Sequence, residues 1–286
     1  MTFNRPDITT REVVEKILSR LAEASEPLPS HLELYRRILL AQNNVKPNIS
    51  SSLPKLKEKA PQRLSQNKPM LTFHEIELDW TELQALFSQI SELAKEYLKP
   101  APEEIDELDE IAVGLDTLKE ATQDWFGSGT LLQKGKSKKT KPSATTGSVI
   151  QASMYPWLAA YANELSPLVG KDSWHQRYCP VCGGNADFAY LEKEYGERWL
   201  VCSRCDAHWY FYRLACPYCG NQEHDKLAFF TDDKGFYRLY VCEKCRRYIK
   251  AIDLRKADEE ILLPLQRVYT LDLDRQTIEQ GYKAED

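Results

Sequence analysis

The sequence contains four short cysteine motifs that decide the fold of its C-terminal part: Cys179-Pro180-Val181-Cys182, Cys202-Ser203-Arg204-Cys205, Cys216-Pro217-Tyr218-Cys219 and Cys242-Glu243-Lys244-Cys245. These motifs hold all eight cysteines of the chain, and each has the form C-x-x-C. Two thiolates at this spacing can reach one tetrahedral ion from a single turn, and two such turns complete a four-cysteine shell. The four motifs therefore predict two closed metal sites.

Two of the motifs are followed by glycine, at Gly183 and Gly220. Proline within the motif fixes φ, and the glycine permits the left-handed turn that points backbone N–H groups at sulfur, as in rubredoxin-type turns. The second and fourth motifs lack this glycine. We therefore expect each ribbon to join one glycine turn to one plain turn, with motifs paired in sequence order. The spacing alone also allows an interleaved pairing.

Composition is that of an ordinary water-soluble protein. The chain has 286 residues, of which 42% are hydrophobic and 28% charged, enough for two or three domains. The N-terminus lacks an apolar signal segment, and no run approaches the roughly 18 apolar residues that cross a bilayer. We expect a cytoplasmic protein without a membrane span, in which thiols stay reduced and bind metal. The net charge of −5 argues against general nucleic-acid binding.

The first part of the chain shows helical periodicity. Apolar residues recur at helical spacing within residues 10–24, and Ser30 with Glu33 forms a capping-box pattern ahead of a second helix. Asp79 can cap a third helix with a long apolar stripe. Further helices are predicted after Pro102, continuing to Leu118, and over residues 148–169. We predict an all-helical domain at residues 1–170, with loops at about 46–70 and 127–147.

Beyond residue 171 the pattern changes to short strands. They are predicted at 188–191, 198–202, 209–212, 227–231, 236–241 and 248–252. The predicted fold class is α+β, in which the helical domain is followed by two tandem rubredoxin-like or zinc-ribbon domains, each with a four-cysteine metal site. The first ribbon spans residues 171–214 and the second spans 215–258. Residues 259–286 are predicted to be a C-terminal tail with a short helix.

The chemistry open to these sites is limited. A four-cysteine shell has no free coordination position, so it can organise a fold or exchange an electron but does not activate water. Such a shell accepts zinc or iron, and the sequence does not distinguish them. His175 and His208 lie near the motifs, but we expect them beside the sites rather than among the ligands. Nucleotide-binding and hydrolase motifs are absent from the sequence, and we predict that the protein is not an enzyme.

Aromatic residues are dense around the cysteines, among them Trp199, Trp209 and Tyr240. Small ribbons need such residues as a core. Together with Arg198 and neighbouring arginines, they could instead form a surface for an extended peptide or single-stranded nucleic acid. Burial of these side chains distinguishes the two interpretations.

The order and spacing of these residues carry a family resemblance. The pattern reads Arg198-x-Leu200-x-Cys202-x-x-Cys205-x-x-x-Trp209-x-x-x-Arg213-x-x-Cys216-x-x-Cys219. With Cys242-x-x-Cys245-x-x-Tyr248-x-Lys250 it resembles the formate dehydrogenase accessory protein family, known as FdhE. A weaker similarity to the same family extends into the helical half of the chain. The first glycine turn lacks the proline that often follows it in the family, and the lysine-rich insert at 134–141 is not a family feature.

The resemblance implies a cytoplasmic accessory factor with rubredoxin-like, iron-capable centres. Such a factor binds the catalytic subunit of formate dehydrogenase and is needed to form the active enzyme. Two alternatives remain open: a nucleic-acid-binding double zinc ribbon and a rubredoxin-like electron carrier. The sequence says nothing about the oligomeric state.

Overall fold

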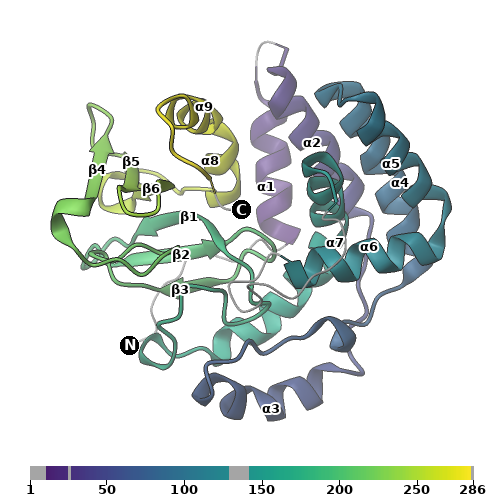
Figure 1. Cartoon of the computed structure of the whole chain (residues 1–286), viewed down its shortest axis with the longest axis horizontal. Coiled ribbons are helices and arrows are strands. Elements are labelled where there is room, and N and C mark those ends of the chain that lie inside the picture. Colours follow the sequence, from purple (N-terminus) through teal and green to yellow (C-terminus); the bar gives the residue numbers. More distant parts are fainter. Residues whose placement is uncertain (1–10, 25–26, 129–141, 285–286) are drawn as a thin grey trace.

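The computed structural model describes residues 11–24, 27–128 and 142–284. Figure 1 shows the helices of the N-terminal part on one side of the molecule and the sheet with the two C-terminal helices on the other. This arrangement confirms the predicted α+β fold with a helical part followed by strands. The predicted lysine-rich insert at 134–141 lies outside the described residues.

The helical part consists of seven α-helices in the described residues. They are α1 (Arg11–Ala22), α2 (Ser30–Asn43), α3 (Leu53–Ser65), α4 (Trp80–Leu98), α5 (Pro102–Val113), α6 (Leu115–Ser128) and α7 (Ala144–Leu165). As predicted, Asp79 caps α4, because its carboxylate accepts hydrogen bonds from the backbone N–H groups of Thr81 and Glu82. The predicted capping box at Ser30 is wrong: Ser30 is already helical, the cap position is Pro29, and Glu33 pairs with Arg36 instead.

The loop prediction for residues 46–70 is also wrong, because α3 lies within this range. Leu56, Ala60 and Leu64 recur every fourth residue and are buried on one face of the helix. Arg63, near the end of α3, forms a bidentate ion pair with Glu75 at 2.7 and 2.8 Å. The segment is mostly polar, so its short apolar stripe was not recognised in the sequence. Pro61 lies inside the helix.

Two further helix boundaries differ from the predictions. The helix expected to run from Pro102 to Leu118 is divided at Gly114, which separates α5 from α6. The loop predicted at 127–147 is helical at both ends, because α6 extends to Ser128 and α7 begins at Ala144. Ser143 caps α7 by accepting a hydrogen bond from the Thr146 N–H at 3.2 Å.

All six predicted strands are present and form a single sheet of order β3-β2-β1-β6-β5-β4. They are β1 (Ala186–Leu191), β2 (Arg198–Cys202), β3 (His208–Tyr210), β4 (Leu227–Thr231), β5 (Tyr237–Cys242) and β6 (Arg247–Asp253). Each ribbon supplies an antiparallel three-stranded unit. The two units join through β1 and β6, which run parallel with Ala189 opposite Ala251. The ribbons therefore share one continuous sheet.

The C-terminal tail contains α8 (Leu263–Tyr269) and α9 (Leu271–Glu279). The short helix predicted in the tail corresponds to α9, whereas α8 was not foreseen. Leu265 of α8 is fully buried in a cluster with Ile17 of α1 and Leu39 of α2. Leu263 packs instead against the sheet, beside Phe188 and Ile252. Helix α8 thus packs on both the helical part and the sheet.

One hydrophobic core extends from the helical part into the ribbons. Its members include Phe87 of α4, Trp157 of α7, Trp209 of β3 and all four cysteines of the first two motifs. The division of the chain at residues 170, 214 and 258 stays a prediction. No helix within the described ranges is long and apolar enough to cross a membrane.

Candidate metal centres

The eight cysteines gather into two clusters of four thiols, and in each cluster all sulfur atoms lie within 4.8 Å of one another. Cys179, Cys182, Cys202 and Cys205 form the first cluster. Cys216, Cys219, Cys242 and Cys245 form the second. The motifs are therefore paired in sequence order, and the interleaved alternative is excluded.

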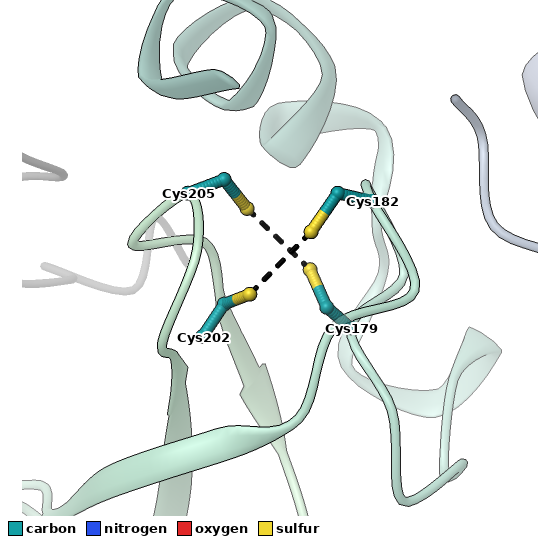
Figure 2. Close-up of side chains that lie close together, drawn as sticks. All are labelled: Cys179, Cys182, Cys202 and Cys205. Carbon is teal, nitrogen blue, oxygen red and sulfur yellow. Dashed lines mark hydrogen bonds between the residues drawn. The ribbon is translucent and has the colours of Figure 1, made fainter. Parts of the chain in front are cut away.

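The sulfur positions suit a tetrahedral metal ion. In the first cluster, two Sγ–Sγ distances are 3.5 and 3.6 Å, and in the second two are 3.7 Å. Disulfide sulfurs would lie only about 2.0 Å apart. Four sulfurs about 2.3 Å from a zinc ion would lie about 3.8 Å apart. Figure 2 shows the four side chains of the first cluster pointing at a common centre from two separate turns. Both clusters can hold a metal ion.

All four cysteine turns have the same backbone form. The residue after the second cysteine donates its N–H to the carbonyl of the first, at 3.0 Å for Gly183 and 2.9 Å for Gly220. Asp206 and Arg246 make the same bond in the second and fourth motifs, with left-handed φ angles of 56° and 55°. The expected difference between glycine turns and plain turns is therefore absent. A non-glycine residue in this region carries backbone strain, which must be offset by its other contacts.

Backbone N–H groups also point at sulfur, as the motif predicts. The N–H of Val181 lies 3.3 Å from Cys179 Sγ, and that of Arg204 lies 3.4 Å from Cys202 Sγ. Such hydrogen bonds favour the thiolate form that binds metal. They place donors where the negative charge of the ligand set accumulates.

The thiols cannot all ionise without a cation between them. Burial raises the pKa of Cys179 and Cys205 well above the usual thiol range. Hydrogen bonds from the neighbouring thiols, first of all Cys179, lower the pKa of Cys182. In the second cluster, burial raises the pKa of Cys216 to about 11. A divalent ion supplies the positive charge that stabilises four thiolates together, so metal binding releases protons.

The first cluster lies deep in the molecule, where the helical part contacts both of its turns. The N–H groups of Met70 and Leu71 donate to the carbonyls of Pro180 and Val181 at 2.8 and 2.9 Å. Arg204 donates to the Trp125 and Phe126 carbonyls of α6, at 3.0 and 2.9 Å. Its guanidinium carbon lies 4.5 Å from the Trp125 ring centroid, the distance of a cation–π contact.

Helices α7 and α8 hold the second turn of the first cluster from another side. The Tyr155 hydroxyl donates to the Asp206 carboxylate at 2.7 Å. Arg267 of α8 forms ion pairs with Asp206 and Asp187, and its Nη2 donates to the Cys202 carbonyl at 2.9 Å. These partners come from distant positions in the chain. No local motif identified them, because their role depends on contacts that only the tertiary fold creates.

The second cluster is more accessible. Cys216 and Cys242 are buried, but Cys245 is partly exposed and Cys219 is exposed. Its turns contact their own ribbon and the C-terminal end: Lys244 pairs with Glu223 at 2.8 Å, and the Arg246 guanidinium stacks 4.0 Å from the ring centroid of Tyr282. The two clusters thus share one ligand set but differ in their surroundings.

This asymmetry predicts the order of metal loss. In the metal-loaded protein treated with EDTA, we expect the ion of the second cluster to leave first, since Cys219 is open to solvent and the first cluster is enclosed. Native mass spectrometry would then show an intermediate with one ion per chain. Alkylation mapping should label Cys216, Cys219, Cys242 and Cys245 in that intermediate. Simultaneous loss of both ions, or earlier labelling of Cys179, would contradict the prediction.

The two histidines lie among aromatic side chains. His208 Nδ1 is 3.4 Å from the Tyr190 hydroxyl, and the His175 ring stacks on Tyr212 with centroids 5.2 Å apart. Neither contributes to a four-cysteine cluster in the described part of the chain.

Most aromatic residues near the cysteines serve as packing. Trp199, Trp209, Phe211 and Tyr218 are buried, and so is Arg198. The exposed exceptions include Tyr195, Tyr212 and the neighbouring pair Phe229 and Phe230 on β4. The sequence-based alternative of an aromatic and basic surface for an extended peptide or single-stranded nucleic acid therefore loses Trp199, Trp209 and Arg198, whereas Tyr240 is partly buried.

Comparison with known proteins agrees with this architecture, although no family model matches the chain. An FdhE homologue from Aquifex aeolicus is 36% identical over 115 residues, which cover 39% of this chain and 40% of the relative. FdhE homologues from Shewanella oneidensis and Pseudomonas aeruginosa are 29% and 27% identical over 146 residues each, covering 46% and 48% of this chain and 46% and 45% of the relatives. The matches thus span less than half the length of these curated relatives.

The crystal structure of the FdhE protein from Pseudomonas aeruginosa has the same fold. The TM-score is 0.62 and the sequence identity 21%, over 97% of this chain and 94% of the other. Fold and cysteine geometry define a class of protein in which a helical part is joined to paired four-cysteine ribbons. The curated relatives confirm the resemblance seen in the sequence, in that this chain is similar to FdhE homologues over part of its length. The solved structure shows that it shares their fold.

Proposed function

We propose that this protein is an accessory factor needed to form an active formate dehydrogenase, and that it binds the catalytic subunit of that enzyme in the cytoplasm. The observation that carries the proposal is the pair of four-cysteine clusters in an FdhE-like fold. We further propose that the eight cysteines are the ligands of two ions, zinc or iron. Closed four-thiolate shells fit a binding role without a catalytic step of its own.

The helical part and the ribbons would act as one binding body. Hydrogen bonds from Met70, Leu71 and Gln151 reach the turns of the first cluster, so metal loading there also fixes the position of the helices. A junction held by a metal ion keeps the binding surface rigid, so less conformational entropy is lost when a partner binds. The first ion would thus support binding by holding both halves together.

One observation favours the electron-carrier alternative for the second cluster. Cys219 is exposed, and a four-thiolate centre that holds iron can exchange an electron with a partner that approaches such an open side. In this view the first ion is structural and the second can report or alter redox state. Elemental analysis of anaerobically purified protein tests this alternative, because zinc in both clusters would contradict it.

Gene deletion in the native host, followed by complementation, tests the main proposal. The deletion should abolish formate dehydrogenase activity while the transcript of the catalytic subunit persists. The wild-type chain and a surface control, Arg37→Gln, should restore activity, whereas Cys179→Ser should not. Affinity purification of the restored chain should recover the catalytic subunit. Unchanged activity in the deletion strain would refute the proposal.

A further inference from the structure

The two edges of the six-stranded sheet differ in how they are covered. Strand β3 forms one edge, and β4 forms the other. The β3 edge is short and packed: Trp209 donates its indole N–H to the Gln176 carbonyl at 3.0 Å, and the His175 ring lies against Tyr210. Among the described residues, no strand pairs with the outer side of β4. Figure 1 shows β4 at the outer end of the sheet, away from the helical part.

The β4 edge lacks the usual protection against association. Natural edge strands are commonly blocked by a charged side chain, a proline or a covering segment. Strand β4 reads Leu227-Ala228-Phe229-Phe230-Thr231, with neither a charge nor a proline. Phe229 and Phe230 are 52% and 55% exposed. Because successive side chains of a strand point to opposite faces, each face of the sheet carries an exposed phenyl ring at this edge.

Hydrogen bonds to β5 determine which backbone groups of β4 point outward. The Lys226 carbonyl accepts from the Glu243 N–H at 2.9 Å, and the Asp232 N–H donates to the Tyr237 carbonyl at 3.3 Å. In an antiparallel ladder alternate residues bond to the same neighbour, so the even-numbered residues of this stretch bond to β5. The residues whose N–H and C=O groups point outward are Leu227, Phe229 and Thr231. Their spacing matches that of another extended strand.

Strand β4 is complementary to itself in the antiparallel register centred on Phe229. There Phe229 lies opposite Phe229 of a second copy, and their outward N–H and C=O groups exchange hydrogen bonds. Phe230 lies opposite the small Ala228 of the second copy, which leaves room for the ring. Lys226 lies opposite Asp232 of the second copy, so each end of the pairing joins opposite charges. We propose that β4 pairs with β4 of a second copy of this chain and forms a two-fold symmetric dimer with one continuous sheet.

The charges select both this register and this occupant. A register centred on Phe230 would place Lys226 opposite Lys234 of the second copy, and one centred on Ala228 would place it opposite Phe230. A strand of another protein would use the same backbone groups, but the match of Lys226 with Asp232 belongs to this chain. The dimer uses the open edge of both copies, and the β3 edges are covered. Association therefore stops at two chains.

Analytical ultracentrifugation of the full-length, metal-loaded chain tests the proposal. We expect the wild type to form a dimer in a concentration-dependent equilibrium. Phe229→Lys and Phe229→Glu should each weaken this dimer at least about tenfold, because the apolar contact is lost and like charges lie directly opposite each other. An equal mixture of the two variants should restore a dimer, since lysine then lies opposite glutamate. This rescue also shows that both variants are folded.

Two further variants check the register and the specificity of the effect. Lys226→Glu should weaken the dimer about threefold to tenfold, because it places glutamate opposite Asp232 of the second copy. Val113→Lys changes a side chain that is 82% exposed on α5 and should leave the dimer unchanged. A wild type that stays monomeric would assign the β4 edge to a different partner and overturn the proposal. Wild-type dimerisation in both Phe229 variants, or a mixture of them that does not dimerise, would also overturn it.

Discussion

The Cys179→Ser variant is expected to lose the metal ion of the first cluster and, with it, the folded state. Cys179 is fully buried in the main hydrophobic core, and its turn receives the hydrogen bonds from Met70 and Leu71. Structural zinc sites contribute about 10–16 kcal/mol to the folding of small metal-binding peptides. Whole domains are stable by only about 5–15 kcal/mol. Loss of this ion therefore removes a free energy as large as the stability of a whole domain.

The matched control is Cys219→Ser, the same substitution at the exposed thiol of the second cluster. We expect this variant to lose the second ion but to keep the first ion and most of its helical content. Metal analysis and circular dichroism of both variants, purified side by side, provide the comparison. If Cys179→Ser retained two ions per chain, its assignment as a ligand would be wrong. If both variants unfolded alike, the proposed difference between the clusters would be wrong.

Arg267→Met is expected to produce the second large effect, a loss of about 3–5 kcal/mol in the free energy of unfolding, which is typical when one partner of a buried ion pair is removed. Arg267 forms ion pairs with Asp187 and Asp206 and donates to the Cys202 carbonyl. The Asp206 side chain is only 4% exposed. Methionine would leave buried carboxylates without a compensating cation beside the first metal centre.

The loss of unfolding free energy caused by Arg267→Met should depend on pH. Burial raises the pKa of Asp187, and the positive charge of Arg267 opposes this rise. Without Arg267 the folded-state pKa rises further above the unfolded value. A carboxyl group with a raised folded-state pKa favours the folded state while protonated and loses that contribution as pH increases through this pKa. The deficit relative to the wild type should therefore shrink as the pH falls toward about 4.

Urea unfolding of wild type and variant across this pH range measures the effect. Arg275→Met is a suitable control, because its ion pair with Asp272 lies on an exposed face of α9, with side chains 70% and 81% exposed. Exposed pairs of this kind contribute about 0–1 kcal/mol. A pH-independent deficit in Arg267→Met would show that lost packing, rather than uncompensated charge, causes it.

The sequence predicted the parts of the fold that short-range chemistry controls. Thiol spacing predicted the two clusters, and strand periodicity located all six strands, including the hairpin in which Gly235 has a φ of 67°. Helix α3 was missed because its three buried residues are surrounded by three lysines, a glutamine and two prolines. Its stability comes from tertiary packing and from the ion pair between Arg63 and Glu75, which lies beyond the end of the helix and is not indicated by helical periodicity.

The surroundings of the clusters were less predictable than their ligands. Asp206 and Arg246 adopt left-handed backbone angles that their residue types do not suggest. The two clusters also differ in their neighbours, because helices α6, α7 and α8 form hydrogen bonds with the turn that carries Cys202 and Cys205. Local sequence indicates which atoms can bind a metal, but the path of the whole chain determines which of the two sites is enclosed.

The parallel pairing of β1 with β6 has a consequence for synthesis on the ribosome. Strands β1 to β3 leave the exit tunnel together with the first four cysteines, so the first ribbon can load its ion early. The outer edge of β1 then stays unpaired until β6 has also emerged, since β6 is its parallel neighbour. An open strand edge is a template for association between chains. We therefore expect the nascent protein to pass through a stage in which the first ribbon is complete but the chain is prone to aggregate. Chains that terminate between the two ribbons would remain at that stage.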